Sequence, residues 1–207
     1  MRRLLSAVYA PFAAVVLLLW IPCACLLVIV GPTLALRREL GRLSVRFILL
    51  CLGVPLRLRG FENLPRGAAI VVCNHASYID GIVLTAALPR DYHFVVQDGA
   101  ARWPLVGACL RRMGVVFVNR DEARSGARTT RELMRLLHAG EPLVLFAEGT
   151  FEAEPGLLPF KAGAFLMAAR CGVPVLPAAI RGSRRFYGGG RRLPRWSALD
   201  IEIAAPL

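Results

Sequence analysis

Lysine is almost absent from the sequence, in which Lys161 is the single lysine among 26 basic residues. Charged residues make up only 19% of the 207 residues, whereas 56% are hydrophobic, and the formal net charge is +12. This composition is more apolar than that of a typical soluble domain and predicts that part of the surface meets lipid. The arginine excess suits anionic lipid head groups, acidic carrier proteins or coenzyme phosphates. No nucleic-acid-binding motif accompanies the charge, so we expect no nucleic-acid partner.

Cysteine pairs at disulfide or metal-binding spacings are also missing. The six cysteines all lie among apolar residues, without a Cys-x-x-Cys pair or a Cys/His ligand spacing. This pattern predicts small buried thiols in a reducing compartment and no metal site. Internal repeats and low-complexity linkers are absent too, so the length fits one domain with an appended segment.

Charge is missing entirely from residues 10–36, a run long enough to cross the roughly 30 Å hydrocarbon layer of a bilayer. Pro22, Gly31 and Pro32 interrupt the run, which leaves two alternatives: one spanning helix, or a bent, re-entrant pair of helices in one leaflet. Arginines flank both ends, and such residues stay on the cytoplasmic side, which favours the re-entrant hairpin. We expect an uncleaved anchor over residues 1–55, in the cytoplasmic (inner) membrane, followed by a catalytic or binding domain over residues 56–207 that faces the cytoplasm.

Short apolar runs that alternate with helical patterns predict an α/β sheet covered by helices on both faces. Strands are expected at 56–60, 68–73, 93–96, 114–120, 142–148 and 173–180, and helices at 82–87, 104–112, 130–138 and 162–170. The basic, glycine-rich segment 184–195 is expected to form a surface loop. Polar clusters follow three of the strands, at 74–80, 119–121 and 147–150, so they could share one edge of the sheet.

The first polar cluster, NHASYID, supports two interpretations of Asp80. In the structural one, Ser77 caps the following helix and Asp80 bonds back to the amide of the cap, as in a capping box. In the catalytic one, His75 lies in the turn before the helix and its ring folds back toward Asp80. The carboxylate would then orient the imidazole as a base near neutral pH. The same cap placement serves both interpretations.

Four blocks in order, NHASYID, GVVFVNR, FAEGT and VPVLPA, make the sequence resemble the glycerolipid acyltransferases, specifically the bacterial 1-acylglycerol-3-phosphate (lysophosphatidate) acyltransferases. The resemblance implies an α/β fold with a central mixed sheet flanked by helices and an N-terminal membrane-associated helical motif. It also implies transfer of a fatty acyl chain, from acyl-CoA or acyl carrier protein, to the free hydroxyl of a lysolipid. No cofactor or metal would be needed.

The resemblance assigns roles to individual residues. His75 would be the general base and Asp80 its orienting partner. Arg120 would meet the acceptor phosphate, and Glu148 with nearby amides would shape the acceptor pocket. The complete set of expected substrate-binding residues is Asn74, Ser77, Gly114, Arg120, Glu148, Gly149, Thr150 and Lys161. Val173, Pro174 and Pro177 match the fourth block, on the acyl-donor side.

The sequence departs from the family pattern at positions that bear on the acceptor. Ala147 and Phe151 stand where the third block, commonly FPEGTR, has proline and arginine, and Gln97 and Gly99 stand where lysine and glutamate are frequent. Two cations that could neutralise a phosphate are therefore missing, although Arg102, Lys161 and Arg181 are candidate replacements. This leaves open a different acceptor, such as a lyso-aminolipid or another lysophospholipid. A non-catalytic membrane lipid-binding protein with the same fold is a further alternative.

Overall fold

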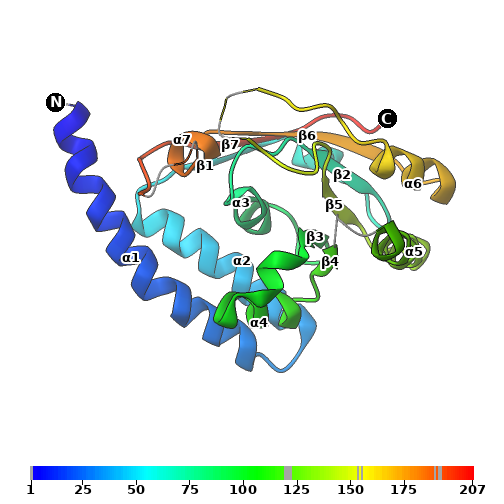
Figure 1. Cartoon of the computed structure of the whole chain (residues 1–207), viewed down its shortest axis with the longest axis horizontal. Coiled ribbons are helices and arrows are strands. Elements are labelled where there is room, and N and C mark those ends of the chain that lie inside the picture. Colours follow the sequence, from blue (N-terminus) through cyan, green and yellow to red (C-terminus); the bar gives the residue numbers. More distant parts are fainter. Residues whose placement is uncertain (1, 119–122, 153, 155, 189, 191–192) are drawn as a thin grey trace.

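A computed structural model describes residues 2–118, 123–152, 154, 156–188, 190 and 193–207 of the chain (Figure 1). Within these residues, seven strands form one sheet in the order β1-β7-β6-β2-β5-β3-β4. The strands are β1 (Leu56–Arg59), β2 (Ile70–Cys73), β3 (His93–Gln97), β4 (Val116–Val118), β5 (Leu143–Phe146), β6 (Val175–Arg181) and β7 (Leu199–Ile203). The α-helices are α1 (Arg2–Val30), α2 (Leu34–Cys51), α3 (Asp80–Ala87), α4 (Pro104–Arg112), α5 (Ala123–His138), α6 (Gly163–Cys171) and α7 (Ser183–Phe186), and short 3₁₀ turns cover Phe61–Asn63 and Asp98–Arg102.

The sheet is mixed, as expected. Strand β2 lies between β5 and β6 and is parallel to both, and β3 is parallel to β5 and β4. Strand β7 is antiparallel to β6 and parallel to β1. All four residues of β2 are buried, which is why its sequence is a continuous apolar run. Because β2 and β5 are parallel neighbours, the segments that follow them leave the same edge of the sheet.

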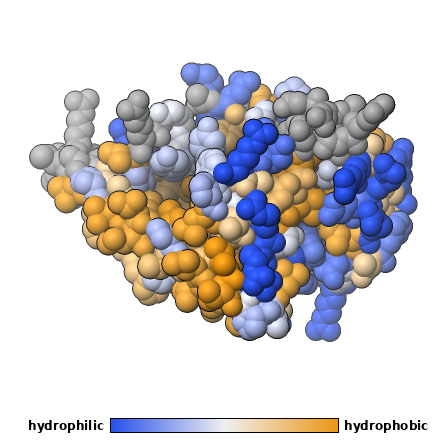
Figure 2. All heavy atoms as spheres, turned by 60° about the horizontal axis from the view of Figure 1, so that its bottom comes forward, coloured by the Kyte–Doolittle hydropathy of each residue, from blue (hydrophilic) through white to orange (hydrophobic). Residues whose placement is uncertain are grey.

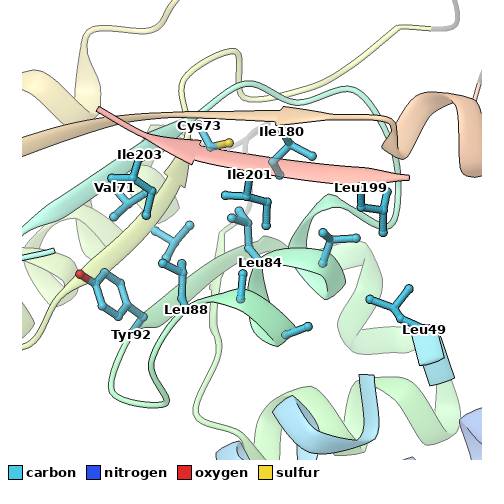
Figure 3. Packing of buried hydrophobic residues seen from close by; sticks show 14 of the residues in the cluster. Leu49, Val71, Cys73, Leu84, Leu88, Tyr92, Ile180, Leu199, Ile201 and Ile203 are labelled. Carbon is cyan, nitrogen blue, oxygen red and sulfur yellow. The ribbon is translucent and has the colours of Figure 1, made fainter. Parts of the chain in front are cut away.

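Helices cover both faces of the sheet, and successive residues of β2 contribute to different faces. Val71 and Cys73 belong to the core beneath α3 and the N-terminal helices, whereas Ile70 and Val72 belong to the core beneath α5 and α6. Figure 3 shows the first of these cores, where Leu84 and the residues around it pack under β2, β6 and β7. Complete burial of one such leucine stabilises the fold by roughly 1.5–3 kcal/mol.

The apolar N-terminus folds into an antiparallel pair of helices, α1 and α2. Helix α1 continues through Pro22, and the chain turns at residues 31–33, after which Thr33 caps α2 by accepting from the amide of Leu36. Of the breaks suggested by the sequence, only the one at Gly31 and Pro32 ends a helix. Trp20 donates its indole N–H to Ser44 O at 3.1 Å and its ring lies 4.5 Å from that of Phe47, which ties the two helices together.

The outer side of this helix pair is strongly apolar. The segment Val8–Val30 of α1 is long and apolar enough to cross a bilayer, and only 17% of its most apolar window is buried. The exposed apolar residues include Val8, Phe12, Val15, Leu18, Leu19, Leu26 and Val30 of α1 and Leu43, Phe47 and Leu50 of α2. Figure 2 shows a large apolar region at the lower left of the molecule. A patch of this extent marks a surface that meets another apolar phase, which is consistent with membrane association.

Arg38 of α2 fastens the helix pair to the sheet domain. The residue is 8% exposed, and its guanidinium donates to Met113 O at 2.9 Å and to Arg90 O and Asp91 O at 3.3 Å. It also lies 3.1 Å from the ring of His93, where burial, and then the charge of Arg38, lowers the pKa of the imidazole. A neutral His93 can accept from the guanidinium. A buried cation is tolerated only when its donors are satisfied, so these contacts fix where the helix pair sits.

Two elements near the C-terminus differ from the sequence predictions. The expected loop at 184–195 is wrong at its start, because residues 183–186 form α7 and Phe186 is buried in the main core at 4% exposure. Strand β7 was not among the predicted strands. Its alternation, with Leu199, Ile201 and Ile203 buried, places its apolar face on α3 and completes the mixed sheet.

Candidate active site

His75 and Asp80 meet in the loop that joins β2 to α3. The Nδ1 atom of His75 lies 2.9 Å from Oδ2 of Asp80, and the two side chains are 15% and 0% exposed. The contact forms because His75 precedes the helix while Asp80 opens it, so the ring folds back over the first turn as the sequence predicted. With Nδ1–H donated to the carboxylate, Nε2 is the ring nitrogen available to take a proton.

The carboxylate of Asp80 also organises the backbone of this loop. Its Oδ2 atom accepts from the amides of Ala76 at 2.6 Å and Ser77 at 2.7 Å, in addition to the imidazole. Within the described residues its other oxygen, Oδ1, is buried without a hydrogen-bond partner. One atom, Oδ2, therefore both accepts from the loop amides and holds the ring, and the catalytic role of Asp80 stays a prediction.

The prediction that Ser77 caps α3 is wrong. The N-cap residue is Ile79, and no side chain caps the helix. The hydroxyl of Ser77 instead donates to Tyr187 O, just after α7, and accepts from the amide of Ile79 at 3.3 Å. Ser77 is fully buried, so it ties the loop between β2 and α3 to the α7 segment.

Glu148 connects the loop after β5 to His75. One carboxylate oxygen accepts from the His75 amide at 2.7 Å, and the other accepts from the Leu158 amide at 2.7 Å. The side chain is only 2% exposed. Two of the three polar clusters predicted to share one sheet edge thus meet there, while the third, at 119–121, lies outside the described residues. In this arrangement Glu148 positions the backbone that carries His75.

We expect Glu148→Gln to lower the free energy of unfolding by about 3 kcal/mol, because a neutral amide cannot accept from both backbone N–H groups and one becomes an unpaired buried donor. Turnover should fall at least tenfold as the His75 backbone shifts. Urea denaturation and steady-state kinetics measure both effects, with the exposed Glu62→Gln as control. Unchanged stability with a raised KM for the acceptor would contradict this role and indicate direct contact with substrate.

Aromatic rings surround His75. The ring of Phe146 stacks on it at a centroid distance of 4.2 Å, and Phe151 meets it edge-on at 4.6 Å. Tyr78, which is exposed, packs edge-on against Phe151 at 4.6 Å. These rings fix the plane of the imidazole and limit its contact with water. Sequence reasoning missed this role, although Phe151 had stood out as a replacement for arginine.

Asn74 and Cys73 have structural contacts. The Asn74 amide group accepts from Ile180 N at 2.7 Å and donates to Ile180 O at 3.2 Å, which extends the pairing of β2 with β6. Contact of Asn74 with substrate remains a prediction. Burial, and then the negative charge of Asp80, raises the pKa of the Cys73 thiol, so this cysteine stays protonated and is a poor nucleophile near pH 7.

The other expected binding residues divide between two edges of the sheet. Gly149 adopts a φ of +71°, and a β-carbon there would lie 3.0 Å from the side chain of Lys161, so Lys161 reaches back over the loop that follows Glu148. Thr150 is exposed on the same loop. Gly114 lies before β4, at the opposite edge, against Arg38 and Leu34 of α2, so the structure does not bring it to His75. Arg120 lies outside the described residues.

A cavity of about 220 Å³ adjoins this site at Glu148. Its size suits a head group better than a complete lipid. Three glutamates contribute to its wall, and Arg184, which also donates to Glu152 O at 2.8 Å, contributes a cation. The described lining consists of Glu148, Glu152, Glu154, Gly156, Leu157, Leu158 and Arg184.

The α/β sheet presents a histidine–carboxylate pair at the end of a parallel strand, and this arrangement has the groups that general-base chemistry requires. The sequence model of the family described as Acyltransferase matches residues 55–181. The chain therefore belongs to the Acyltransferase family.

Individual relatives carry more specific names. The chain is 32% identical over 167 residues to a 1-acyl-sn-glycerol-3-phosphate acyltransferase of Neisseria meningitidis, covering 80% of this chain and 61% of that protein. It is 35% identical over 135 residues to a chloroplastic enzyme of the same name from Brassica napus, covering 64% and 39%. The chain thus spans less than two thirds of the length of these curated relatives. The crystal structure of the 1-acyl-sn-glycerophosphate acyltransferase PlsC from Thermotoga maritima, 24% identical, superposes with a TM-score of 0.76 over 100% of this chain and 87% of that one, which shows the shared fold.

Proposed function

We propose that this protein transfers a fatty acyl group from a thioester donor to the free hydroxyl of 1-acylglycerol-3-phosphate, giving phosphatidic acid for phospholipid synthesis. The observation that carries the proposal is the hydrogen bond from His75 Nδ1 to a fully buried Asp80, which leaves Nε2 as the base. The relatives named for this reaction give further support.

The proposed chemistry uses the histidine twice. As the acceptor oxygen attacks the thioester carbonyl carbon, its proton passes to Nε2 of His75. The carbon–sulfur bond then breaks, and the leaving thiolate takes the proton back from the imidazolium. Asp80 keeps its negative charge throughout and stabilises the imidazolium through Nδ1–H. The donor, acyl-CoA or acyl carrier protein, is a substrate, and the reaction needs no resident cofactor.

The helix pair would bring the site to its lipid substrate. The exposed apolar side of α1 and α2 suits burial in a bilayer, with the sheet domain outside it. Arginines lie on both sides of the apolar run, so both ends should remain on one side of the membrane. We place the protein on the cytoplasmic (inner) membrane with its active site toward the cytoplasm.

A second acceptor class, the lyso-aminolipids, is favoured by a specific observation. The cavity beside Glu148 is lined by Glu152 and Glu154 as well, and its described cations are limited to Arg184. A wall with more carboxylates than cations suits an ammonium group better than a phosphate monoester. Phe151, in edge-on contact with His75, stands where the family commonly has arginine, so it supplies no positive charge for a phosphate.

An acceptor panel tests the proposed function. Purified full-length protein receives a labelled acyl thioester and, in parallel, 1-acylglycerol-3-phosphate, a lyso-aminolipid and a monoacylglycerol without phosphate. We expect kcat/KM for 1-acylglycerol-3-phosphate to exceed that for the monoacylglycerol at least tenfold. A higher kcat/KM for the lyso-aminolipid would identify that lipid as the acceptor and would leave the proposed acyl-transfer chemistry unchanged. Absence of transfer to every acceptor would contradict the proposed function.

A further inference from the structure

Helix α5 presents a row of arginines to solvent. Arg128, Arg131 and Arg135 are exposed, whereas Thr129, Leu133 and Leu137 are buried against the sheet. At 100° per residue the three arginines fall within a sector of about 60°, and they span about 10 Å along the helix axis. The row is therefore a narrow, convex strip of positive charge opposite the buried face of the helix.

Helix α6 lies beside α5 and carries a further exposed arginine. Leu166 and Arg170 of α6 are exposed and lie one turn apart on the same face. In the described part of the chain, no ion pair involves any of the four arginines, and the neighbouring Glu132 is itself exposed without such a pair. We name Arg128, Arg131, Arg135, Leu166 and Arg170 the α5–α6 surface. Its positive charge is not neutralised by those residues.

The α5–α6 surface lies on the opposite face of the sheet from the apolar helix pair. Helices α5 and α6 pack on the core that contains Ile70 and Val72 of β2, while α1 and α2 pack on the core that contains Val71. In Figure 1, α5 and α6 lie at the right, far from α1, and Figure 2 shows hydrophilic residues gathered at that end. A bilayer that covers the outer side of α1 would thus leave this surface in water.

The same two helices begin at the edge of the sheet that carries His75. Strand β4 is parallel to β2 through the β3 and β5 pairings, and α5 begins five residues after β4 ends. Just before α6, the Lys161 amide donates to Ala147 O at 2.8 Å, directly beside Glu148. A molecule bound across α5 and α6 would therefore have its nearest route to His75 over the N-terminal ends of these helices.

We propose that the α5–α6 surface docks an acidic acyl carrier protein, which delivers its thioester to His75; this inference rests on the proposed acyl transfer. A convex helical strip matches the face of another protein, whereas small charged ligands such as coenzyme A bind in concave sites. The cavity beside Glu148 includes no residue of the strip. The exposed Leu166, on the neighbouring helix α6, supplies an apolar contact beside the charged residues, as protein interfaces require.

The test compares two charge-matched double variants of the full-length protein. Arg131→Glu/Arg135→Glu alters the α5–α6 surface, and Arg59→Glu/Arg66→Glu makes the same charge change at exposed arginines elsewhere. Fluorescence anisotropy gives the Kd for labelled holo acyl carrier protein, and kinetics give kcat/KM with acyl carrier protein and CoA esters of one fatty acid. We expect the first variant to weaken Kd and kcat/KM for the carrier protein at least tenfold. The kcat/KM of this variant with acyl-CoA should stay within twofold of that of the unaltered protein. For the control variant, the Kd for the carrier protein and the kcat/KM with it should also stay within twofold.

Each other outcome overturns the inference. Equal loss with both donors would indicate a general structural effect, and selective loss with acyl-CoA would assign the surface to the nucleotide. Reduced binding to anionic vesicles with unchanged donor kinetics would assign it to the bilayer. Failure of the proposed function is recognised separately, because the unmodified protein would then transfer from neither donor to any lysolipid while the anisotropy measurement still reports carrier-protein binding.

Discussion

His75→Ala is expected to lower kcat for acyl transfer by about 10⁴-fold, because the variant lacks the nitrogen that takes the proton from the acceptor hydroxyl. Neighbouring groups do not replace it. Asp80 is buried behind the ring, and the Glu148 carboxylate is occupied by two backbone amides. Steady-state kinetics with a labelled acyl thioester measure the effect, and KM for both substrates should change little.

The His75 variants need a control for folding, since the ring packs between Phe146 and Phe151. His75→Gln keeps an amide donor near Asp80 but has no basic nitrogen, so it should be as inactive as the alanine variant. Its Tm should lie closer to that of the unaltered protein than the Tm of the alanine variant does. His138→Ala, at an exposed histidine of α5, should retain full activity. Turnover within tenfold of normal in either His75 variant would exclude the imidazole as the base.

Asp80→Asn is expected to reduce kcat by about 10³–10⁴-fold while the protein still folds. An asparagine oxygen can accept from the amides of Ala76 and Ser77, as the carboxylate oxygen does. It carries no charge to stabilise the imidazolium, and its NH₂ group would take the place of the buried Oδ1 that has no hydrogen-bond partner among the described residues. That unpaired donor should lower the free energy of unfolding by about 1–3 kcal/mol.

Two measurements separate the roles of Asp80. Chemical denaturation reports the loop-organising role, and kcat reports the effect on the base. The exposed Asp91→Asn removes one carboxylate elsewhere and should change neither quantity. If Asp80→Asn lost stability but kept its turnover, the carboxylate would be a structural element alone.

The sequence predicted the parts of the fold that depend on local patterns. Helix α4 begins at Pro104 and ends at Arg112 as expected, because proline suits the first turn and a helical pattern runs to the next strand. The buried strands β2, β5 and β6 follow continuous apolar runs. The contact between His75 and Asp80 was also predictable, because five residues of loop and first helical turn leave little freedom for the ring.

Features that depend on distant segments were not predictable from local patterns. Strand β7 has only five residues and is stabilised by pairing with β6 and β1. The bond from Ser77 to Tyr187 joins residues 110 positions apart, so a capping motif suggested a different partner for the hydroxyl. In the sequence, Arg38 is one of several arginines that flank the apolar run. Its burial and its hydrogen bond to Met113 O depend on the packing of α2 against the sheet domain, which local patterns do not specify.

Single-turnover acyl transfer tests directly whether His75 is the base. A limiting amount of labelled acyl thioester is mixed with excess protein, either unaltered or carrying His75→Ala, and with saturating lysolipid, and the acylated lipid is measured over time. We expect both proteins to bind the two substrates with similar Kd and the chemical step in the variant to slow by about 10⁴-fold. A chemical step of equal rate in the two proteins would contradict the role of His75 as the base.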